Sequence, residues 1–507
     1  MKDMDRTVVE ASAQFEALLG SVNEAAAHPT ALHEVEGDVF RALLALGRTL
    51  LIHFLQQKGV GDGGETVSLD TGEILLRGEI TSRPYLSIFG EIDIERYVYG
   101  SKEAPLDAEL NLPEWKYSYL LQEWGLNFTT KESFQEAGQT LDQILGLDLA
   151  VGTLERLSRK VADEVAPFRE DLPAPPPEEE ADLLVATVDC KGVPLTRAKK
   201  TSSKQGKRRK KGEKKNKKKM ACVGAVYTID PFVRTVDDIV DEAQRKARAL
   251  DRPAHKRVQA ELLDDKESLF ASLALQVGQR RGEPLCTVLF LSDGERKLWT
   301  LQKQYLPEAI GILDLWHVME YLWKGAHIFH PEGSSQAEAW VGQRLEMLLQ
   351  GKVGYVIGGL KQMSTKYALK GTKKKTLHRV ITHFHNNRAH MHYDEYIAHS
   401  YPIGSGVAEG ACRHLVKDRM ERTGMRWTED GAQAILDLRR TYLNGDWKEY
   451  WTHYSNAENE RLYGHLTFDN SRTYKATAGQ VLFLVETVRA PFVPQADRAW
   501  GCRFSSV

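Results

Sequence analysis

The chain has 507 residues, of which 42% are hydrophobic and 27% are charged, and its formal net charge is -2. This length exceeds what one hydrophobic core usually serves, so we expect about two to four globular domains. The five cysteines contain no Cys-x-x-Cys pair, which argues against a zinc knuckle and favours a reducing compartment. No signal peptide and no apolar run of about 18 residues is present, so we expect a soluble, cytoplasmic protein without a membrane partner.

The first third of the chain predicts helices interrupted by a small sheet. In residues 1–60, apolar residues recur at intervals of three and four, as in VFRALLALGRTLLIHFLQQ, which predicts helices. Residues 61–105 hold short alternating runs between Gly and Asp, which predict a small antiparallel sheet. Helical spacing returns in residues 106–175, where a Gly-containing turn within residues 133–161 indicates either a DNA-binding helix-turn-helix or a plain helical hairpin. The Pro-rich, acidic residues 176–182 predict a linker and a domain boundary.

Beyond this linker the pattern changes to strands followed by alternating helices and strands. LLVATVDC and MACVGAVYTID predict two strands, and residues 232–240 (FVRTVDDIV) a third, whereas residues 253–279 show helical spacing. The run CTVLFLS predicts a further strand, which is followed by a helix, a short strand and another helix. This order is that of an RNase H-like domain, so we predict an α/β fold with an RNase H-like catalytic core.

Two aspartates fall where such a fold would bring them together. Asp189 lies inside the first strand and Asp293 lies just past the strand CTVLFLS. These strands are neighbours in an RNase H-like sheet, and convergent carboxylates are the ligands that Mg²⁺ prefers. Two such ions, about 3.5–4 Å apart, can drive an in-line phosphoryl displacement. The alternative for Asp293 is a plain turn residue, because the sequence Ser-Asp-Gly favours a turn. Asp189 is harder to explain in this way, since burying its carboxylate without a partner or a metal ion would cost free energy.

The candidate for a third carboxylate is Glu409, which follows the turn signal PIGSG at the start of a predicted helix. The alternative is that Glu409 only complements the helix dipole. The same helix is basic, and so is the segment of residues 197–219 between the first two strands, which we expect to be disordered without DNA. Basic segments of this kind follow a phosphate backbone without reading bases. The predicted DNA contacts are Lys199, Lys200, Lys207, Arg208, Arg209, Lys210, Lys211, Arg413, Lys417, Arg419, Arg422 and Arg426.

Several blocks within residues 185–427 resemble the DDE transposases of bacterial insertion sequences, most closely the ISKra group. They include TVDCKGVPL, FLSDGERKLW, LDLWHVMEYLW and the long block that ends in YPIGSGVAEGACRHLVKDRMERTGMRW. The resemblance places the family's acidic triad on Asp189, Asp293 and Glu409 as ligands of two Mg²⁺ or Mn²⁺ ions. Asp314 with His317 resembles the C/D-x-x-H motif that precedes an all-helical insertion, which makes His317 a further candidate catalytic residue.

The resemblance implies a transposase that binds the terminal inverted repeats of its element, cuts DNA and joins it to a target, as a dimer or larger assembly in the bacterial cytosol. The alternatives are an RNase H-like nuclease without strand transfer and a domesticated DNA-binding protein. We assign no zinc site to the histidines of HFHNNRAHMH, because H-x-H pairs on a helix point apart. The predicted organisation is a helical segment (1–60), a β region (61–105), a DNA-binding helical region (106–175), a linker (176–182), the first part of the catalytic core (183–324), a helical insertion (325–400), the second part of the core (401–450) and a tail (451–507).

Overall fold

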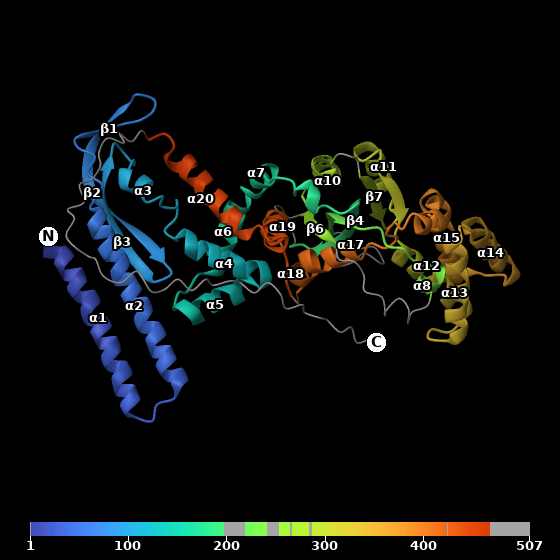
Figure 1. The fold of residues 1–507 in the computed structure, drawn as a ribbon, viewed down its shortest axis with the longest axis horizontal. Coiled ribbons are helices and arrows are strands. Elements are labelled where there is room, and N and C mark those ends of the chain that lie inside the picture. Colours follow the sequence, from blue (N-terminus) through green and yellow to red (C-terminus); the bar gives the residue numbers. More distant parts are fainter. Residues whose placement is uncertain are drawn as a thin grey trace, which may run out of the picture.

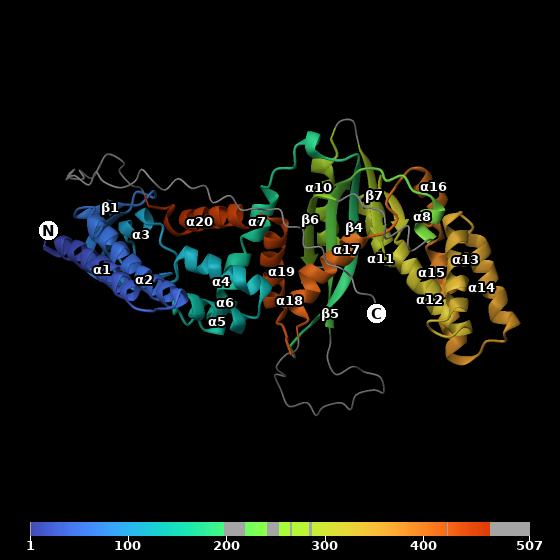
Figure 2. The same ribbon diagram turned by 60° about the horizontal axis from the view of Figure 1, so that its bottom comes forward.

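The computed structural model describes residues 2–196, 218–240, 253–263, 266–282, 286–422 and 424–466. These residues form an elongated α/β molecule with a three-stranded sheet towards one end and a five-stranded sheet in the middle (Figures 1 and 2). Within the described ranges, every helix is too short or too polar to cross a membrane.

The N-terminal end is a helical hairpin beside a small sheet. Helix α1 (Lys2–Ala27) runs back along α2 (Leu32–Lys58), and strands β1 (Thr66–Ser68), β2 (Ile74–Ser87) and β3 (Gly90–Tyr99) form an antiparallel meander. Short helices follow: α3 (Pro105–Glu109), α4 (Tyr119–Lys131), α5 (Phe134–Leu145), α6 (Val151–Ala162) and α7 (Val165–Glu170). Helix α5 has well-defined ends, because Ser133 and Glu136 form a capping box at its start and Gly146 takes a left-handed conformation at its end.

The larger sheet has the strand order β6-β5-β4-β7-β8. Its strands are β4 (Leu183–Pro194), β5 (Lys218–Ile229), β6 (Ala254–Glu261), β7 (Thr287–Ser292) and β8 (Ile310–Leu313). The pairs β4–β5 and β5–β6 are antiparallel, whereas β4–β7 and β7–β8 are parallel. The first and fourth strands of this sheet in chain order are therefore direct neighbours, as the sequence predicted.

The prediction of the third strand was wrong. Residues 236–240 form the short helix α8 (Val236–Val240), because Thr235 and Asp238 exchange the hydrogen bonds of a helix N-cap. The third strand is instead β6, which lies inside the range that showed helical spacing. Val258 and Ala260 of β6 are buried. The pairing of β6 with β5 outweighs the helical spacing of its local sequence.

Helices cover both faces of the larger sheet. One face packs against α10 (Lys266–Arg280), α11 (Arg296–Tyr305) and α12 (Leu315–Phe329). The other packs against α17 (Gly406–Ala411), a π-helical turn (Cys412–Lys417), α18 (Asp418–Met420) and α19 (Glu429–Asn444). Beyond α12, the far end of the molecule consists of α13 (Ser335–Leu349), α14 (Val353–Lys366), α15 (Gly371–Asn386) and α16 (Tyr393–Ala398) (Figure 2).

The helices before the Pro-rich residues 176–182 share a hydrophobic cluster with helices that come after Glu409. Leu126 of α4 and Leu157 of α6 are buried in one cluster with Leu438 of α19. Helix α20 (Trp447–Tyr463) adds Tyr450 and Tyr454 to the same cluster. The Pro-rich residues therefore separate two stretches of sequence that share one hydrophobic cluster, although each stretch also has clusters of its own.

Candidate metal centre

Asp189 and Asp293 lie side by side because of the register of β4 and β7. The parallel pairing begins at Leu183 with Thr287 and continues residue by residue to Val188 with Ser292. Asp189 is the next residue of β4, and Asp293 is the first residue after β7. The prediction that these two side chains converge is confirmed, since one carboxylate oxygen from each belongs to a single compact group.

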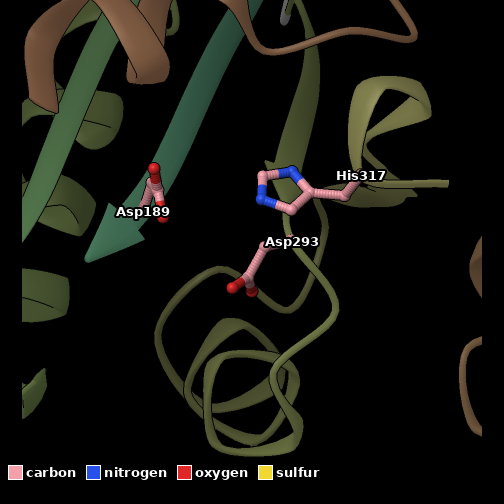
Figure 3. A group of neighbouring side chains, drawn as sticks. All are labelled: Asp189, Asp293 and His317. Atoms are coloured by element: carbon pink, nitrogen blue, oxygen red, sulfur yellow. The ribbon is translucent and has the colours of Figure 1, made fainter. Parts of the chain in front are cut away.

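The third member of this group is His317, in the first turn of α12. One ligand atom from each of Asp189, Asp293 and His317 lies within 4.8 Å of the others, and all three residues are half-buried. Figure 3 shows the side chains approaching one another from a strand, from the loop after β7 and from a helix. Two carboxylates and an imidazole, brought together from three elements, could hold a divalent cation.

Asp314 forms hydrogen bonds with several of the elements that surround this group. Its backbone N–H donates to the carbonyl of Ser292 (2.9 Å), at the end of β7. Its Oδ1 accepts from the N–H of Trp316 (2.7 Å) and so caps α12. Its Oδ2 accepts from both the backbone N–H (3.2 Å) and the hydroxyl of Ser405, just before α17. The sequence pattern pointed to Asp314 but not to Ser405, because a contact across 91 residues leaves no local signal.

Electrostatics link Asp314 to the candidate metal-binding group. The Nδ1 of His317 lies 3.6 Å from Oδ2 of Asp314, which is buried. This carboxylate, with Asp293 and Asp189 adding to its effect, outweighs the burial of the ring and raises the pKa of His317 to about 9. Burial raises the pKa of Asp293, although its carboxylate accepts a hydrogen bond from the N–H of Glu295 (2.9 Å) and lies near His317. The group thus combines two carboxylates with an imidazole whose protonated form these carboxylates stabilise, and His317 would serve as a metal ligand only in its neutral form.

Glu409 lies outside this group. It is exposed on α17, and within the described part of the chain the candidate metal-binding group contains no glutamate. The helix that carries Glu409 widens into the π-helical turn immediately after Ala411, a feature that occurs frequently at functional sites. The catalytic role of Glu409 stays a prediction.

The cavity beside Asp293 is polar and basic. Its volume is about 730 Å³, and its lining includes Gly294, Arg296, Tyr321, Arg379 and His383. His383 stacks on Tyr321, with ring centroids 3.8 Å apart. His390 stacks in the same way on Trp299 (3.9 Å). These two members of the histidine-rich segment therefore pack against aromatic rings.

The predicted DNA contacts fall into three groups: residues outside the described ranges, exposed residues, and the buried Arg419. Seven of them, Lys199, Lys200, Lys207, Arg208, Arg209, Lys210 and Lys211, lie outside the described residues. Arg413, Lys417, Arg422 and Arg426 are exposed, and Arg422 forms an ion pair with Glu136 (2.7 Å).

Arg419 differs from the other basic residues because it is fully buried. Its Nε donates to the carbonyl of Thr129 (2.7 Å), and its guanidinium lies over the rings of Trp427 and Phe134. Its side chain therefore belongs to the core, and the expectation that Arg419 contacts DNA is incorrect for this fold.

Comparisons with known proteins include a weak structural likeness. No family model matches the chain, and no curated protein matches its sequence. Among solved structures, it is similar to a chain of the Drosophila P element transposase strand transfer complex, with 10% sequence identity, 68% of this chain and 82% of that chain covered, and a TM-score of 0.23. A TM-score of this size does not establish a shared fold, so the function has to be inferred from the site itself.

Proposed function

We propose that the protein is a DDE-type DNA transposase with an RNase H-like catalytic core. The observation that carries this proposal is the position of Asp189 and Asp293 directly after the last paired residues of two adjacent parallel strands, with His317 beside them. The strand order β6-β5-β4-β7-β8, with two antiparallel and two parallel pairings, supports the RNase H-like assignment. The resemblance of the motifs around Asp189, Asp293 and Glu409 to insertion-sequence transposases supports the reaction.

Each side chain has a proposed part in the reaction. Asp189 and Asp293 would hold a divalent cation, with Mg²⁺ or Mn²⁺ favoured by carboxylate oxygens. Bound ions of this kind activate an attacking oxygen and stabilise the leaving one. His317 would donate a hydrogen bond to a phosphate oxygen of the scissile strand. Glu409 would complete a second ion site, which requires its helix to approach the two aspartates when DNA is bound.

The surroundings of the metal centre suit a phosphodiester backbone. The cavity next to Asp293 presents Arg296 and Arg379, and both are exposed. Arg413, Lys417 and Arg426 add exposed positive charge after Glu409. We propose that these residues position the DNA, while α5 and α6 recognise the ends of the element.

Metal binding and cleavage test different parts of the proposal. We expect the purified full-length protein to bind Mn²⁺, measured by calorimetry or electron paramagnetic resonance, and Asp189→Asn or Asp293→Asn to abolish this binding. The same substitutions should abolish Mg²⁺-dependent cleavage of duplexes taken from the DNA on either side of the reading frame, with DNA binding retained. Glu409→Gln should remove cleavage while weakening Mn²⁺ binding less than either aspartate substitution.

Asp230→Asn is a matched control. Asp230 is exposed and follows β5 at the opposite end of the sheet from Asp189, so its substitution removes the same charge without touching the site. Cleavage at the wild-type rate by Asp189→Asn or Asp293→Asn would remove that residue from the catalytic set. Cleavage without joining of the released end to target DNA would favour a nuclease, and DNA binding without cleavage would favour a domesticated DNA-binding protein.

A further inference from the structure

A cavity lies where α7 meets the edge of the larger sheet. Its walls come from α7 and the residues just after it, and from β6, α10 and α19. Figures 1 and 2 show these elements close together near the middle of the molecule. None of the described residues that line it belongs to the candidate metal-binding group or to the basic cavity beside Asp293. The proposed function therefore assigns this cavity no role.

Three buried polar atoms of the lining residues have no hydrogen-bond partner within the described part of the chain. They are Nη1 of Arg440, Nε2 of Gln259 and Oε1 of Gln276. Arg440 and Gln259 are only 3% and 1% exposed. Buried polar groups in native proteins nearly always bind another protein group, an ordered water or a ligand. Two donors and one acceptor of this lining therefore need partners from within the cavity.

Arginines dominate the charge of the lining, and two of them lack a directly bound carboxylate. Arg257 and Arg280 each form a close ion pair. Within the described residues, the carboxylates beside Arg169 and Arg440 lie 4.0 and 3.7 Å away, which is beyond hydrogen-bond distance. Two guanidinium groups therefore line this space without an anion in direct contact.

Arg169 and Arg440 are close enough to repel each other. Burial, and then the charge of Arg440, lower the pKa of Arg169 to about 10, and the attraction of Glu261 or of Asp437 is smaller than either effect. Arg169 still keeps its charge at neutral pH. Water in the cavity would satisfy the donors but leave this repulsion in place. A bound anion would do both, because it accepts hydrogen bonds from the two guanidinium groups and balances their charge.

We infer that this cavity binds one inorganic phosphate ion. The oxygens of hydrogen phosphate accept hydrogen bonds from Arg169, Arg440 and the amide of Gln259. Its own O–H donates to Oε1 of Gln276, which sulfate at neutral pH has no proton to do. The cavity has a volume of about 60 Å³, whereas a single water needs about 10–15 Å³, so a free ion fits and a nucleotide does not.

The bound ion would connect segments that are far apart in the chain. Arg169 belongs to α7, Gln259 to β6 and Arg440 to α19. Phosphate would thus join the region before residues 176–182 to the larger sheet. It should stabilise the folded chain, because a ligand that binds only the folded state shifts the folding equilibrium towards that state. The inference depends on this cavity alone and does not require the proposed function.

Calorimetric titration of the full-length protein with inorganic phosphate, without DNA or divalent metal, tests the inference. We expect one phosphate ion to bind to each chain and sulfate to bind about tenfold more weakly, since sulfate leaves Gln276 without its hydrogen bond. Phosphate should also raise the midpoint of thermal unfolding relative to chloride at equal ionic strength. Arg169→Gln should weaken phosphate binding about tenfold or more, because a hydrogen bond from a charged group is lost.

Gln259→Glu tests the charge argument with a side chain of the same size. The new carboxylate keeps the hydrogen bonds that Gln259 accepts from Arg169 (3.2 Å) and Ser272 (2.8 Å), and it balances the guanidinium charges. This variant should unfold at a higher temperature than the wild type in phosphate-free buffer and should gain no stability from phosphate.

The control is Arg41→Gln, which removes a guanidinium from an exposed side chain of α2. It should bind phosphate like the wild type. Circular dichroism verifies that each variant folds. A wild-type protein that binds no phosphate would overturn the inference, and so would equal affinities for phosphate and sulfate. Unchanged phosphate binding in both Arg169→Gln and Gln259→Glu would place the ion elsewhere and overturn it too.

Discussion

The carboxylate of Asp314 binds the backbone N–H and the hydroxyl of Ser405, and through this contact the helix that carries His317 is fixed to the loop that precedes Glu409. Leu315 strengthens the connection by donating its N–H to the carbonyl of Ile403 (2.9 Å). Asp314 also contacts the end of β7 next to Asp293. One buried residue, through its side chain and its backbone N–H, therefore connects three segments of the site that are distant in sequence.

Asp314→Ala should destabilise the protein more than the loss of a helix cap alone. A missing cap costs about 1 kcal/mol, and leaving the buried donors of Ser405 without an acceptor costs about 1–3 kcal/mol more. Urea unfolding of the metal-free protein measures the total. Ser334→Ala is the matched control, because Ser334 caps α13 through the N–H of Ala337 and contacts no part of the site. Equal destabilisation of the two variants would contradict the connecting role of Asp314.

The ion pair between Glu180 and Arg280 should make stability depend on pH in the acidic range. The side chains of Arg280 and Glu180 are only 3% and 8% exposed, and two hydrogen bonds of 2.6 and 2.8 Å join them. Burial alone would raise the pKa of Glu180, but the hydrogen bonds from Arg280 and Thr228 outweigh it and lower the pKa below 4.5. A lowered carboxyl pKa stabilises the fold above pH 4.5, and this contribution is lost as the pH falls through the folded-state pKa.

Glu180→Gln should therefore reduce the free energy of unfolding at pH 7 by about 3–5 kcal/mol, because it leaves Arg280 buried without a charged partner. Its stability should also change less than that of the wild type between pH 5 and pH 3, roughly the range over which a lowered carboxyl titrates. Urea unfolding at several pH values measures both effects. The exposed pair of Glu320 and Lys324 provides the control, since Glu320→Gln should change stability by about 0.5 kcal/mol or less. Parallel pH profiles for Glu180→Gln and the wild type would disprove this account.

The basic segment between β4 and β5 should bind DNA through its charge. The last two lysines of the predicted loop belong to β5, where Lys218 pairs with Glu421 and Lys219 with Glu429, so only residues 199–217 should be replaced. A Gly/Ser segment of equal length should weaken binding to all duplexes and flatten the salt dependence by about 0.9 for each phosphate that is no longer neutralised. A scrambled segment of the same composition should bind like the wild type. An unchanged salt slope for the Gly/Ser variant would mean that this segment does not touch DNA.

A fragment of residues 1–175 should fail to fold cooperatively. It lacks α19 and α20, which supply Leu438, Tyr450 and Tyr454 to the core of α4 and α6. Circular dichroism and thermal unfolding of the fragment, compared with the full chain, measure this. A cooperative transition in the isolated fragment would show that the shared core is dispensable. Recognition of the element ends therefore has to be tested in the full chain and not in this fragment. A suitable variant is Arg156→Ala, which replaces an exposed residue of α6.

The sequence by itself predicted most of the elements and the approach of Asp189 to Asp293. The spacing of apolar residues predicted the N-terminal helices and the strands around Asp189 and before Asp293, because helices and strands have different periods that a local pattern carries. Once the order of elements indicated which strands are neighbours, the approach of Asp189 to Asp293 followed from it. The structure confirms that approach through the register of β4 and β7.

Only the tertiary structure decided the features that depend on which faces meet. Strand β6 forms because β5 offers it a partner, against a local pattern that predicted a helix. Arg419 is buried because its side chain faces Phe134 and Trp427, although it shares a helix with exposed basic residues. The contact of Asp314 with Ser405 likewise depends on packing between distant segments. A local sequence pattern records the period of an element but not the identity of the surface that covers it, so these contacts become visible only in the folded chain.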